Sequence, residues 1–268
     1  MKLLSGRELA GYIKERQAIR VRSLIQLSGI VPRLAIIVTI DNPVIDIYMR
    51  LKNQYAADIG IKVEVFRINQ SQVAQLLQTL NKDDSVHGII IQLPLEDPSS
   101  TDELVNLVSP IKDVDALGEK AQFDPATPMA ILWLLAGYNV DLQGKKVVLI
   151  GRGKLVGRPL EKMLKSSGID VETVDSSTKN VSKLTLQADI IVTATGKHAV
   201  LTSEMIKQGA VVVDAGVASE GGKTIGDLDK AVFHRTDITI TPEKGGVGPL
   251  TICALFDNVI TAAERQKN

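Results

Sequence analysis

A tyrosine and a lysine four residues apart, Tyr48 and Lys52, are side chains whose types and spacing can do chemistry. In a helix, residues at this spacing share one face. A lysine held in a partly apolar pocket loses proton affinity and becomes usable as an acid or base near neutral pH. A packed tyrosine beside a solvated lysine is the commoner outcome for an arbitrary pair. The turn formed by Asp41, Asn42 and Pro43 favours the chemical interpretation, because it starts this helix just beyond a strand.

An amide ends the apolar stretch GIIIQLPL at residues 88–95, where Gln92 is followed by Leu93. In open α/β sheets ligands bind outside the carboxyl ends of the strands, so Gln92 is expected to face a site. An amide can hydrogen-bond to Lys52 in either charge state, whereas an unpaired carboxylate would raise the pKa of the lysine. The sequence therefore predicts that Gln92 tunes Lys52.

A carboxylate in the stretch KDVDAL, Asp115, suits a heterocycle that presents adjacent N–H donors. Because Lys112 and Asp113 precede it, a solvated turn explains the stretch equally well.

The stretch TPEKGGVGPLT at 241–251 contains Gly245, Gly246 and Pro249 before a final helix. Such glycine-rich backbone is typical of a ligand-facing loop, although a plain turn is the alternative.

The stretch VVLIGRGKLVGRP at 147–159 resembles a dinucleotide-binding turn. Gly151 and Gly153 follow a strand and precede a helix, and Gly157 comes one residue later than in the usual G-x-G-x-x-G pattern. Glycines allow close backbone approach, and the helix N-terminus offers free N–H groups to a phosphate. This context favours nucleotide binding over a purely structural turn.

Two cues about the dinucleotide disagree. About 20 residues beyond the glycines a Rossmann fold presents a side chain to the adenosine ribose, and here the next strand ends in TVDSST. Asp175 can accept hydrogen bonds from the ribose hydroxyls, which favours NAD. Arg152 and Ser176 can hold a 2′-phosphate, which favours NADP.

Short β-branched stretches alternate with amphipathic ones along the chain, which predicts βαβ units and parallel sheets. The first helix is expected to open on Ser5 with a capping box completed by Glu8. The predicted strands span residues 34–39, 61–67, 88–92, 146–150, 170–174, 189–193, 210–214 and 237–240.

The chain is expected to form two domains. The aperiodic, proline-bearing stretch that ends at Pro128 separates an α/β domain of parallel strands at 1–127 from a Rossmann-type domain at 128–249. A helix is expected at about 128–138. The last helix, 250–268, is expected to fold back onto the first domain.

Composition and net charge argue against several kinds of partner and site. The 268 residues carry 31 basic and 31 acidic side chains, and this zero net charge argues against a nucleic-acid partner. Cys253 is the only cysteine and the three histidines are scattered, so we expect neither disulfides nor a metal site. We expect no signal peptide and no stretch approaching a membrane span, and therefore a cytoplasmic protein.

Eight stretches in order carry a family resemblance: YMRLK, GIIIQLPL, KDVD, PATP, GRGKLVGRPL, GAVVVDAG, GDLD and TPEKGGVGPLT. Over essentially its whole length the chain resembles bifunctional methylenetetrahydrofolate dehydrogenase/methenyltetrahydrofolate cyclohydrolase. The resemblance implies a three-layer folate domain, a Rossmann domain, an active cleft between them and a homodimer. It implies NAD(P)-dependent oxidation of methylenetetrahydrofolate and hydrolysis of the methenyl product to 10-formyltetrahydrofolate.

The resemblance also assigns roles to residues. Tyr48 would stack on the folate ring system, Lys52 would be the essential lysine tuned by Gln92, and Asp115 would anchor the pterin. NADP is the implied cofactor, with NAD possible because of Asp175. Cofactor contacts would fall on Gly151, Arg152, Gly153, Asp175, Ser176 and Val217, and folate contacts also on Leu93, Gly245, Gly246 and Pro249.

The chain departs from the family pattern at several positions. It has GRG where the family commonly has GRS, VDS where it has CHS, and DVDA where it has DVDG. Glu243 and Lys244 replace a Val-Pro pair. The order of the motifs along the chain excludes a short-chain dehydrogenase, because in that class the Tyr-x-x-x-Lys pair follows the glycine loop. The remaining alternatives are a binding protein that has lost catalysis and a dehydrogenase without the hydrolase activity.

Overall fold

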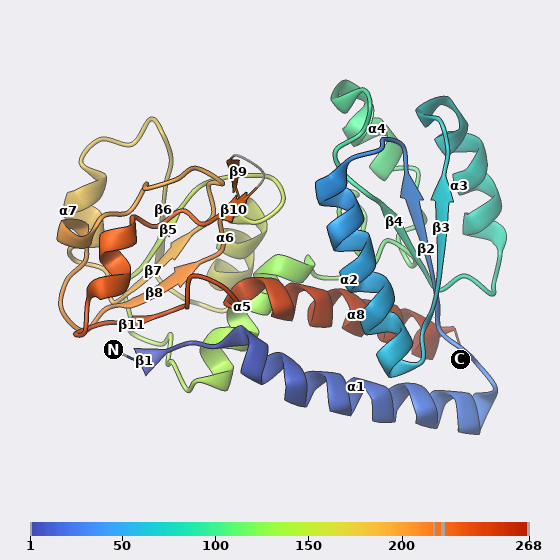
Figure 1. Ribbon diagram of the computed structural model, residues 1–268, viewed down its shortest axis with the longest axis horizontal. Coiled ribbons are helices and arrows are strands. Elements are labelled where there is room, and N and C mark those ends of the chain that lie inside the picture. The colour runs from blue at the N-terminus through green and yellow to red at the C-terminus, as the bar shows by residue number, and fades with distance from the viewer. Residues whose placement is uncertain (1, 217, 221–222, 267–268) are drawn as a thin grey trace. The chain divides into compact units, whose positions relative to one another are not determined.

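Two compact units make up the chain, and the computed structural model describes residues 2–216, 218–220 and 223–266. Unit 1 comprises Met1–Ala10 and Thr127–Thr251, and unit 2 comprises Gly11–Ala126 and Ile252–Asn268. Helices α1 (Gly6–Ser28) and α8 (Val247–Arg265) contribute residues to both units. Each unit contains a parallel sheet flanked by helices (Figure 1), so the predicted α/β class is confirmed.

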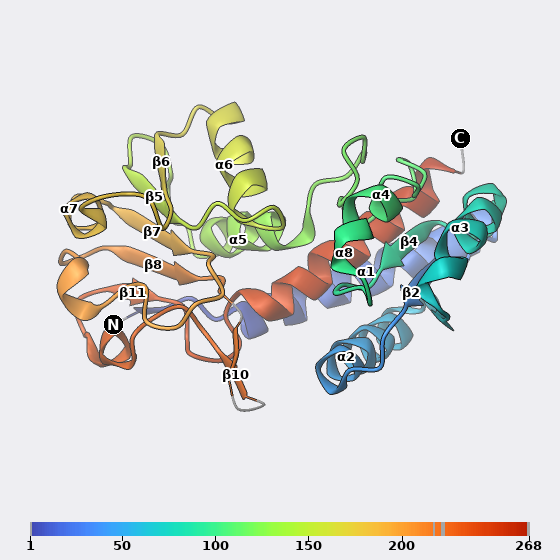
Figure 2. The ribbon, with the colours of Figure 1, turned by 90° about the horizontal axis from the view of Figure 1, so that it is seen from above.

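Unit 2 is built on a parallel sheet in the order β3-β2-β4. Strand β2 is buried residue after residue because helices cover both of its faces. Ala35 and Ile37 pack with side chains of α3 and α4, and α2 lies on the opposite side of the sheet (Figure 2). The further elements of the unit are α2 (Pro43–Ile59), α3 (Val73–Lys82), α4 (Thr101–Val105), β2 (Arg33–Val38), β3 (Lys62–Arg67) and β4 (Gly88–Ile91).

The strand order of unit 2 creates a switch point. From β2 the chain runs through α2 to β3 on one side, and then through α3 to β4 on the other side of β2. Ligands bind where the strand order reverses in this way, at the carboxyl ends of the strands. The Gln92 N–H donates to Ile37 O at 2.9 Å and so extends the β2–β4 pairing by one residue. Gln92 therefore stands at the switch point.

The parts of α1 and α8 that belong to unit 2 pack together and against α2. Gln17 Nε2 donates to Cys253 O at 2.8 Å, and the Tyr55 ring stacks on Phe256 with 5.2 Å between the ring centroids. By length and composition α8 could cross a membrane, contrary to the expectation that no stretch approaches that length. Most of its side chains are buried against protein, as in a core helix of a soluble protein.

Unit 1 contains a parallel sheet in the order β1-β11-β8-β7-β5-β6, a Rossmann-type arrangement whose switch point lies between β5 and β7. Strand β1 pairs with β11 through Leu3 and Ile240, which places the first ten residues in unit 1 rather than with residues 11–126. The main elements are β1 (Lys2–Leu3), α5 (Ala126–Gly137), β5 (Val147–Ile150), α6 (Gly157–Ser166), β6 (Val171–Val174), α7 (Val181–Thr185), β7 (Ile190–Thr193), β8 (Val211–Asp214), β9 (Ala218–Glu220), β10 (Lys223–Ile225) and β11 (Thr239–Ile240).

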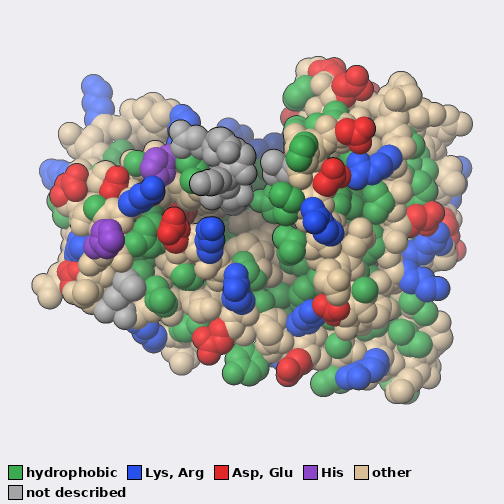
Figure 3. All heavy atoms as spheres, in the orientation of Figure 1, with side chains coloured by type: hydrophobic (Ala, Val, Ile, Leu, Met, Phe, Trp, Pro, Cys, Tyr) green, Lys and Arg blue, Asp and Glu red, His purple; other side chains and the backbone are tan. Residues whose placement is uncertain are grey.

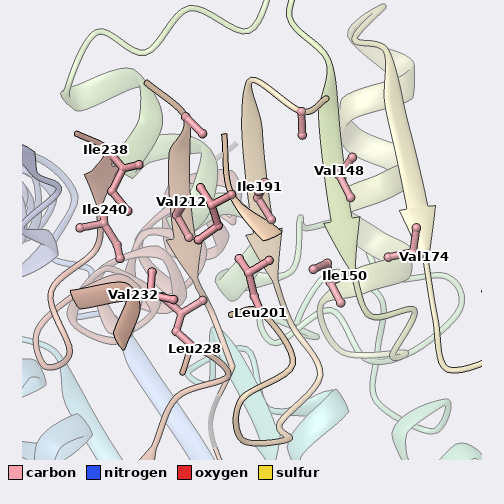
Figure 4. Close-up of a cluster of buried hydrophobic side chains, with 13 residues drawn as sticks. Val148, Ile150, Val174, Ile191, Leu201, Val212, Leu228, Val232, Ile238 and Ile240 are labelled. Atoms are coloured by element: carbon pink, nitrogen blue, oxygen red, sulfur yellow. The ribbon is translucent and has the colours of Figure 1, made fainter. Parts of the chain in front are cut away.

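Aliphatic side chains form the core of unit 1. Val148, Ile191 and Val212, from the neighbouring strands β5, β7 and β8, lie on one face of the sheet (Figure 4). Leu201 and Leu228 pack on them from the segments that follow β7 and β10. The strand residues of this cluster are all aliphatic.

Helix α1 begins as expected, with the Glu8 N–H donating to Ser5 Oγ at 3.3 Å. The other half of the predicted capping box, in which the Glu8 side chain would accept from the Ser5 N–H, is wrong. The Ser5 N–H donates to the Tyr138 hydroxyl at 3.0 Å, and that hydroxyl donates to Glu8 Oε2 at 3.3 Å. A tyrosine from α5's end thus stands between the two residues of the box.

Charged side chains of both signs are interspersed on the face shown in Figure 3. Several charged side chains of the chain are paired, including Arg67 with Asp46 at 2.6 Å and Arg235 with Asp237 at 2.6 Å. Surface ion pairs each contribute about 0–1 kcal/mol to stability. The positive charges of these two arginines are therefore partly neutralised by acidic neighbours.

Candidate active site

A hydrogen bond joins the lysine of α2 to the amide that follows β4. Lys52 Nζ donates to Gln92 Oε1 at 2.8 Å, and Gln92 Nε2 donates to Leu93 O at 3.0 Å. The second bond fixes which end of the amide faces the lysine. The Leu93 side chain packs against the apolar cluster under the sheet, and the Leu93–Pro94 peptide bond is cis. Lys52 and Gln92, 40 residues apart in the chain, thus meet at the switch point.

Asp115 is the third member of this group. Burial lowers the pKa of the Lys52 amine, and the negative charge of Asp115 partly opposes that change. Burial raises the pKa of the Asp115 carboxyl, and Lys52 partly opposes it in turn. An amine that gives up its proton more readily than a free lysine is suited to proton transfer near neutral pH.

Tyr48 lies one turn before Lys52 on α2 and is 36% exposed. The spacing puts the two side chains on the same face of the helix. An exposed aromatic ring offers a flat surface on which a planar heterocycle can stack. The structure therefore places an exposed aromatic ring one helical turn from Lys52.

Lys112 holds the Asp115 loop against the sheet. Its side chain is 2% exposed, and its Nζ donates to Leu80 O at 3.1 Å and to Asp83 O at 2.7 Å. Those carbonyls belong to the C-terminal end of α3, where the helix dipole favours a cation. The Ile89 N–H donates to Lys112 O at 2.8 Å, so the segment runs beside β4.

Asp113 stabilises the same loop by a hydrogen bond to its backbone. Its Oδ2 accepts from the Gly118 N–H at 2.8 Å, and burial raises its pKa to about 6. Because Lys112 and Asp113 are both buried, the interpretation of KDVD as a solvated turn is wrong. Ala116 follows with φ of 55°, in the left-handed region that favours glycine.

Asn258 is a positioning residue that the sequence analysis missed. It is 5% exposed on α8, and its Nδ2 donates to Val114 O and to Asp124 O, both at 2.9 Å. The bond to Val114 holds the peptide unit that carries Asp115. The only signal in the sequence is an amide within the apolar stretch that forms α8.

The glycines after β5 have different roles. A Cβ on Gly151, where φ is +114°, would lie 2.4 Å from Ala194 O, and a Cβ on Gly157 would lie 2.2 Å from Gly151 O. Both positions therefore require glycine. A Cβ on Gly153 would have no neighbour within 4 Å, so this position can accept a side chain. The turn and α6 form the strand–turn–helix arrangement at which Rossmann folds bind a dinucleotide phosphate.

Asp175 directly follows β6, as the sequence analysis expected. Its Oδ1 accepts from the Ser177 N–H at 2.9 Å and from Ser177 Oγ at 2.6 Å, and these bonds lower its pKa. The positive charge of Arg152 lowers that pKa further. Ser176 is exposed. Val217 lies outside the described residues.

The glycine-rich stretch before α8 belongs to unit 1, whereas Tyr48, Lys52, Gln92 and Asp115 belong to unit 2. Gly245, with φ of +85°, accepts from the Arg7 N–H through its carbonyl at 3.0 Å. A Cβ on Gly6 would lie 1.8 Å from Gly246 O. The absence of a side chain at Gly6 thus allows this loop to pack closely against the start of α1. Pro249 lies in the first turn of α8.

Comparisons of the sequence with known protein families give matches that cover both units. Residues 4–115 match the catalytic domain of tetrahydrofolate dehydrogenase/cyclohydrolase, and residues 125–267 match its NAD(P)-binding domain. The chain is 38% identical to the bifunctional protein FolD of Campylobacter jejuni, with 100% of both chains covered.

Solved structures give the same result. The crystal structure of the bifunctional enzyme FolD from Campylobacter jejuni superposes with a TM-score of 0.93 at 38% identity, covering 99% of both chains. The Trypanosoma brucei enzyme, whose structure is a complex with NADP and an inhibitor, has a TM-score of 0.91 at 28% identity and covers 98% of this chain and 97% of that one. The chain therefore belongs to the tetrahydrofolate dehydrogenase/cyclohydrolase family.

Proposed function

We propose that the chain catalyses two consecutive reactions on the one-carbon unit of tetrahydrofolate. The first oxidises 5,10-methylenetetrahydrofolate to the 5,10-methenyl compound, and the second hydrolyses that compound to 10-formyltetrahydrofolate. Family membership supports both activities. The observation that carries the residue assignment is the 2.8 Å hydrogen bond between Lys52 Nζ and Gln92 Oε1, next to Asp115.

Lys52 is the proton-transfer group of the hydrolysis in this proposal. Its neutral amine accepts a proton from the water that adds to the methenyl carbon. The bond from that carbon to N5 then breaks, N5 takes up the proton of the new hydroxyl group, and one proton in all is released. Gln92 keeps the amine oriented without adding a negative charge that would hold its proton.

The folate is held by residues of unit 2 around this amine. Tyr48 supplies the ring on which the pterin stacks, and the Asp115 carboxylate accepts hydrogen bonds from adjacent pterin N–H groups. Leu93 contributes its backbone at the end of β4. We also assign Gly245, Gly246 and Pro249 to the folate side, on the strength of the family resemblance.

The cofactor is NADP in this proposal, with NAD as a second acceptor because of Asp175. When bound, it takes up the hydride that leaves the methylene carbon. Its phosphates suit the turn after β5 and the N-terminus of α6, and its adenosine ribose suits the end of β6. The residues assigned to it are Gly151, Arg152, Gly153, Asp175, Ser176 and Val217.

One assay tests the proposal. Purified protein is supplied with methylenetetrahydrofolate and either NADP or NAD, and the methenyl absorbance is followed. Appearance of that absorbance and its enzyme-dependent decay are expected. A methenyl product that decays only at the spontaneous rate would identify a dehydrogenase without hydrolase activity. Absence of product with both dinucleotides would identify a binding protein.

We further propose a cytoplasmic homodimer, which the resemblance to the family supports. Sedimentation of the purified protein tests the assembly. The expected species has twice the 28.9 kDa mass of one chain. A species of 28.9 kDa at micromolar concentration would contradict the dimer.

A further inference from the structure

Two carboxylates flank the arginine of the glycine turn. Arg152 follows Gly151 directly, and its Nη2 lies 3.4 Å from Glu161 Oε1 on α6. The second carboxylate, Asp175, directly follows β6, and the positive charge of Arg152 lowers its pKa. The Arg152 guanidinium therefore has an ion-pair partner on α6 and also interacts electrostatically with Asp175.

Glu161 is held in place better than the arginine it contacts. The Glu161 side chain is 14% exposed, whereas that of Arg152 is 48% exposed. Lys165, one turn later on α6, donates to the same Glu161 oxygen at 2.7 Å. The carboxylate is thus a fixed partner, and Arg152 is the group that must move if another anion binds it.

The difference between the two dinucleotides lies at this point. NADP carries a phosphate on the adenosine ribose where NAD carries a hydroxyl, and a nearby arginine accommodates that phosphate. A phosphate bound to Arg152 would have to displace Glu161 and would meet the Asp175 carboxylate. A ribose hydroxyl needs no cation and can donate to Asp175. Both carboxylates therefore favour the unphosphorylated ribose.

We propose that Glu161 is a specificity-determining residue for the dinucleotide. By pairing with Arg152 it weakens the attraction for the 2′-phosphate, and so brings the use of NAD close to that of NADP. This inference rests on the proposed function, since it requires that unit 1 binds NAD(P). Glu161 acts through Arg152, whereas Asp175 acts on the ribose itself.

Direct binding of two fragments tests the inference without catalysis. Adenosine 2′,5′-bisphosphate and adenosine 5′-monophosphate are titrated calorimetrically into the wild type and into Glu161→Gln, which preserves side-chain volume. The variant is expected to bind the bisphosphate about two- to five-fold more tightly, because one partly exposed charge pair is removed. Affinity for the monophosphate is expected to change less than twofold. Equal bisphosphate affinity of the two proteins would overturn the inference.

A double-mutant cycle shows whether the effect runs through Arg152. In an Arg152→Met background the Glu161→Gln change is expected to give no gain, whereas a gain of the same size would assign the effect to Lys165. Glu172→Gln, on neighbouring β6, is the matched control, and its bisphosphate affinity is expected to stay that of the wild type. In the full reaction, the ratio of kcat/KM with NADP to that with NAD should rise by the same two- to five-fold.

The outcomes separate this inference from the function on which it rests. Hydrolysis of the methenyl compound is expected to be unchanged in Glu161→Gln. If the wild type oxidises no methylenetetrahydrofolate, the proposed function fails, while the two fragments still report on Glu161. If both activities are present and the bisphosphate affinity does not change, only the role of Glu161 fails.

Discussion

Lys52 donates to Gln92 Oε1 at 2.8 Å while the other end of the same amide donates to Leu93 O at 3.0 Å. The amide is therefore held at both ends and presents only an acceptor to the lysine. Such an acceptor orients an ammonium group or a neutral amine without choosing between them. The charge state of the lysine therefore depends on burial, which lowers the pKa of Lys52, and on the negative charge of Asp115, which raises that pKa.

Replacing Lys52 with alanine should remove hydrolysis of the methenyl compound. General acid-base groups contribute about 10²- to 10⁴-fold to a rate, and a loss in this range is expected. Dinucleotide binding should not change, because the glycine turn lies in unit 1. The measurement is decay of the methenyl absorbance, corrected for the spontaneous rate. Lys62→Ala, an exposed lysine of β3, is the control, and undiminished hydrolysis in Lys52→Ala would remove the lysine from the mechanism.

Replacing Gln92 with glutamate should shift the pH dependence of hydrolysis. In the proposed mechanism the neutral amine of Lys52 is the active form, so the rate should rise with pH and level off above the lysine pKa. A carboxylate next to the amine favours the ammonium form, so the rise should move to higher pH by about one unit or more. Rates measured between pH 6 and 10 in Gln92→Glu and in Gln92→Met test this. The methionine variant adds no charge, and the same displacement in both variants would argue against an electrostatic cause.

Replacing Asp115 with asparagine should have two effects. The KM for the folate should rise by about ten- to a hundred-fold, because a hydrogen bond to a charged group is lost. The rise of the hydrolysis rate with pH should move to lower pH, since Asp115 raises the pKa of Lys52. This displacement is opposite in sign to that of Gln92→Glu. A folate KM equal to that of the wild type would show that the carboxylate does not anchor the substrate.

Replacing Ala116 with glycine should stabilise unit 2. Alanine at φ of 55° has a steric cost that glycine does not have, which favours the glycine variant. The greater freedom of glycine in the unfolded chain opposes this gain in part. The expected net gain in the free energy of unfolding is about 0.5–1 kcal/mol. Urea unfolding followed in Ala116→Gly measures it. Ala57→Gly, at an exposed position inside α2, should instead lose about 1 kcal/mol, and an equal loss at Ala116 would contradict the argument.

The sequence predicted the strands well because their aliphatic residues leave few alternatives. The stretch expected at 146–150 is β5 at Val147–Ile150, and the one expected at 88–92 is β4 at Gly88–Ile91. The meeting of Lys52 with Gln92 could also be anticipated. Helix periodicity fixed the face of the lysine, and the rule on the carboxyl ends of parallel strands fixed the place of the amide.

Contacts between distant parts of the chain could not be predicted in the same way. Nothing local indicates that Lys112 is buried under the end of α3, or that Asn258 reaches back to Val114. The two residues of β1 form a strand only because β11 is there to pair with them. The pairing of Glu161 with Arg152 likewise depends on how α6 leaves the glycine turn.

The reach of Asn258 to Val114, across 144 residues of sequence, has a consequence for biosynthesis. A ribosome releases the segment that bears Lys52 and Asp115 long before it makes the amide that fixes the Asp115 loop. This region of the nascent chain therefore stays incomplete while residues 127–251 of unit 1 are translated. Premature termination before Asn258 would yield a protein able to retain its nucleotide fold yet lacking a finished folate pocket.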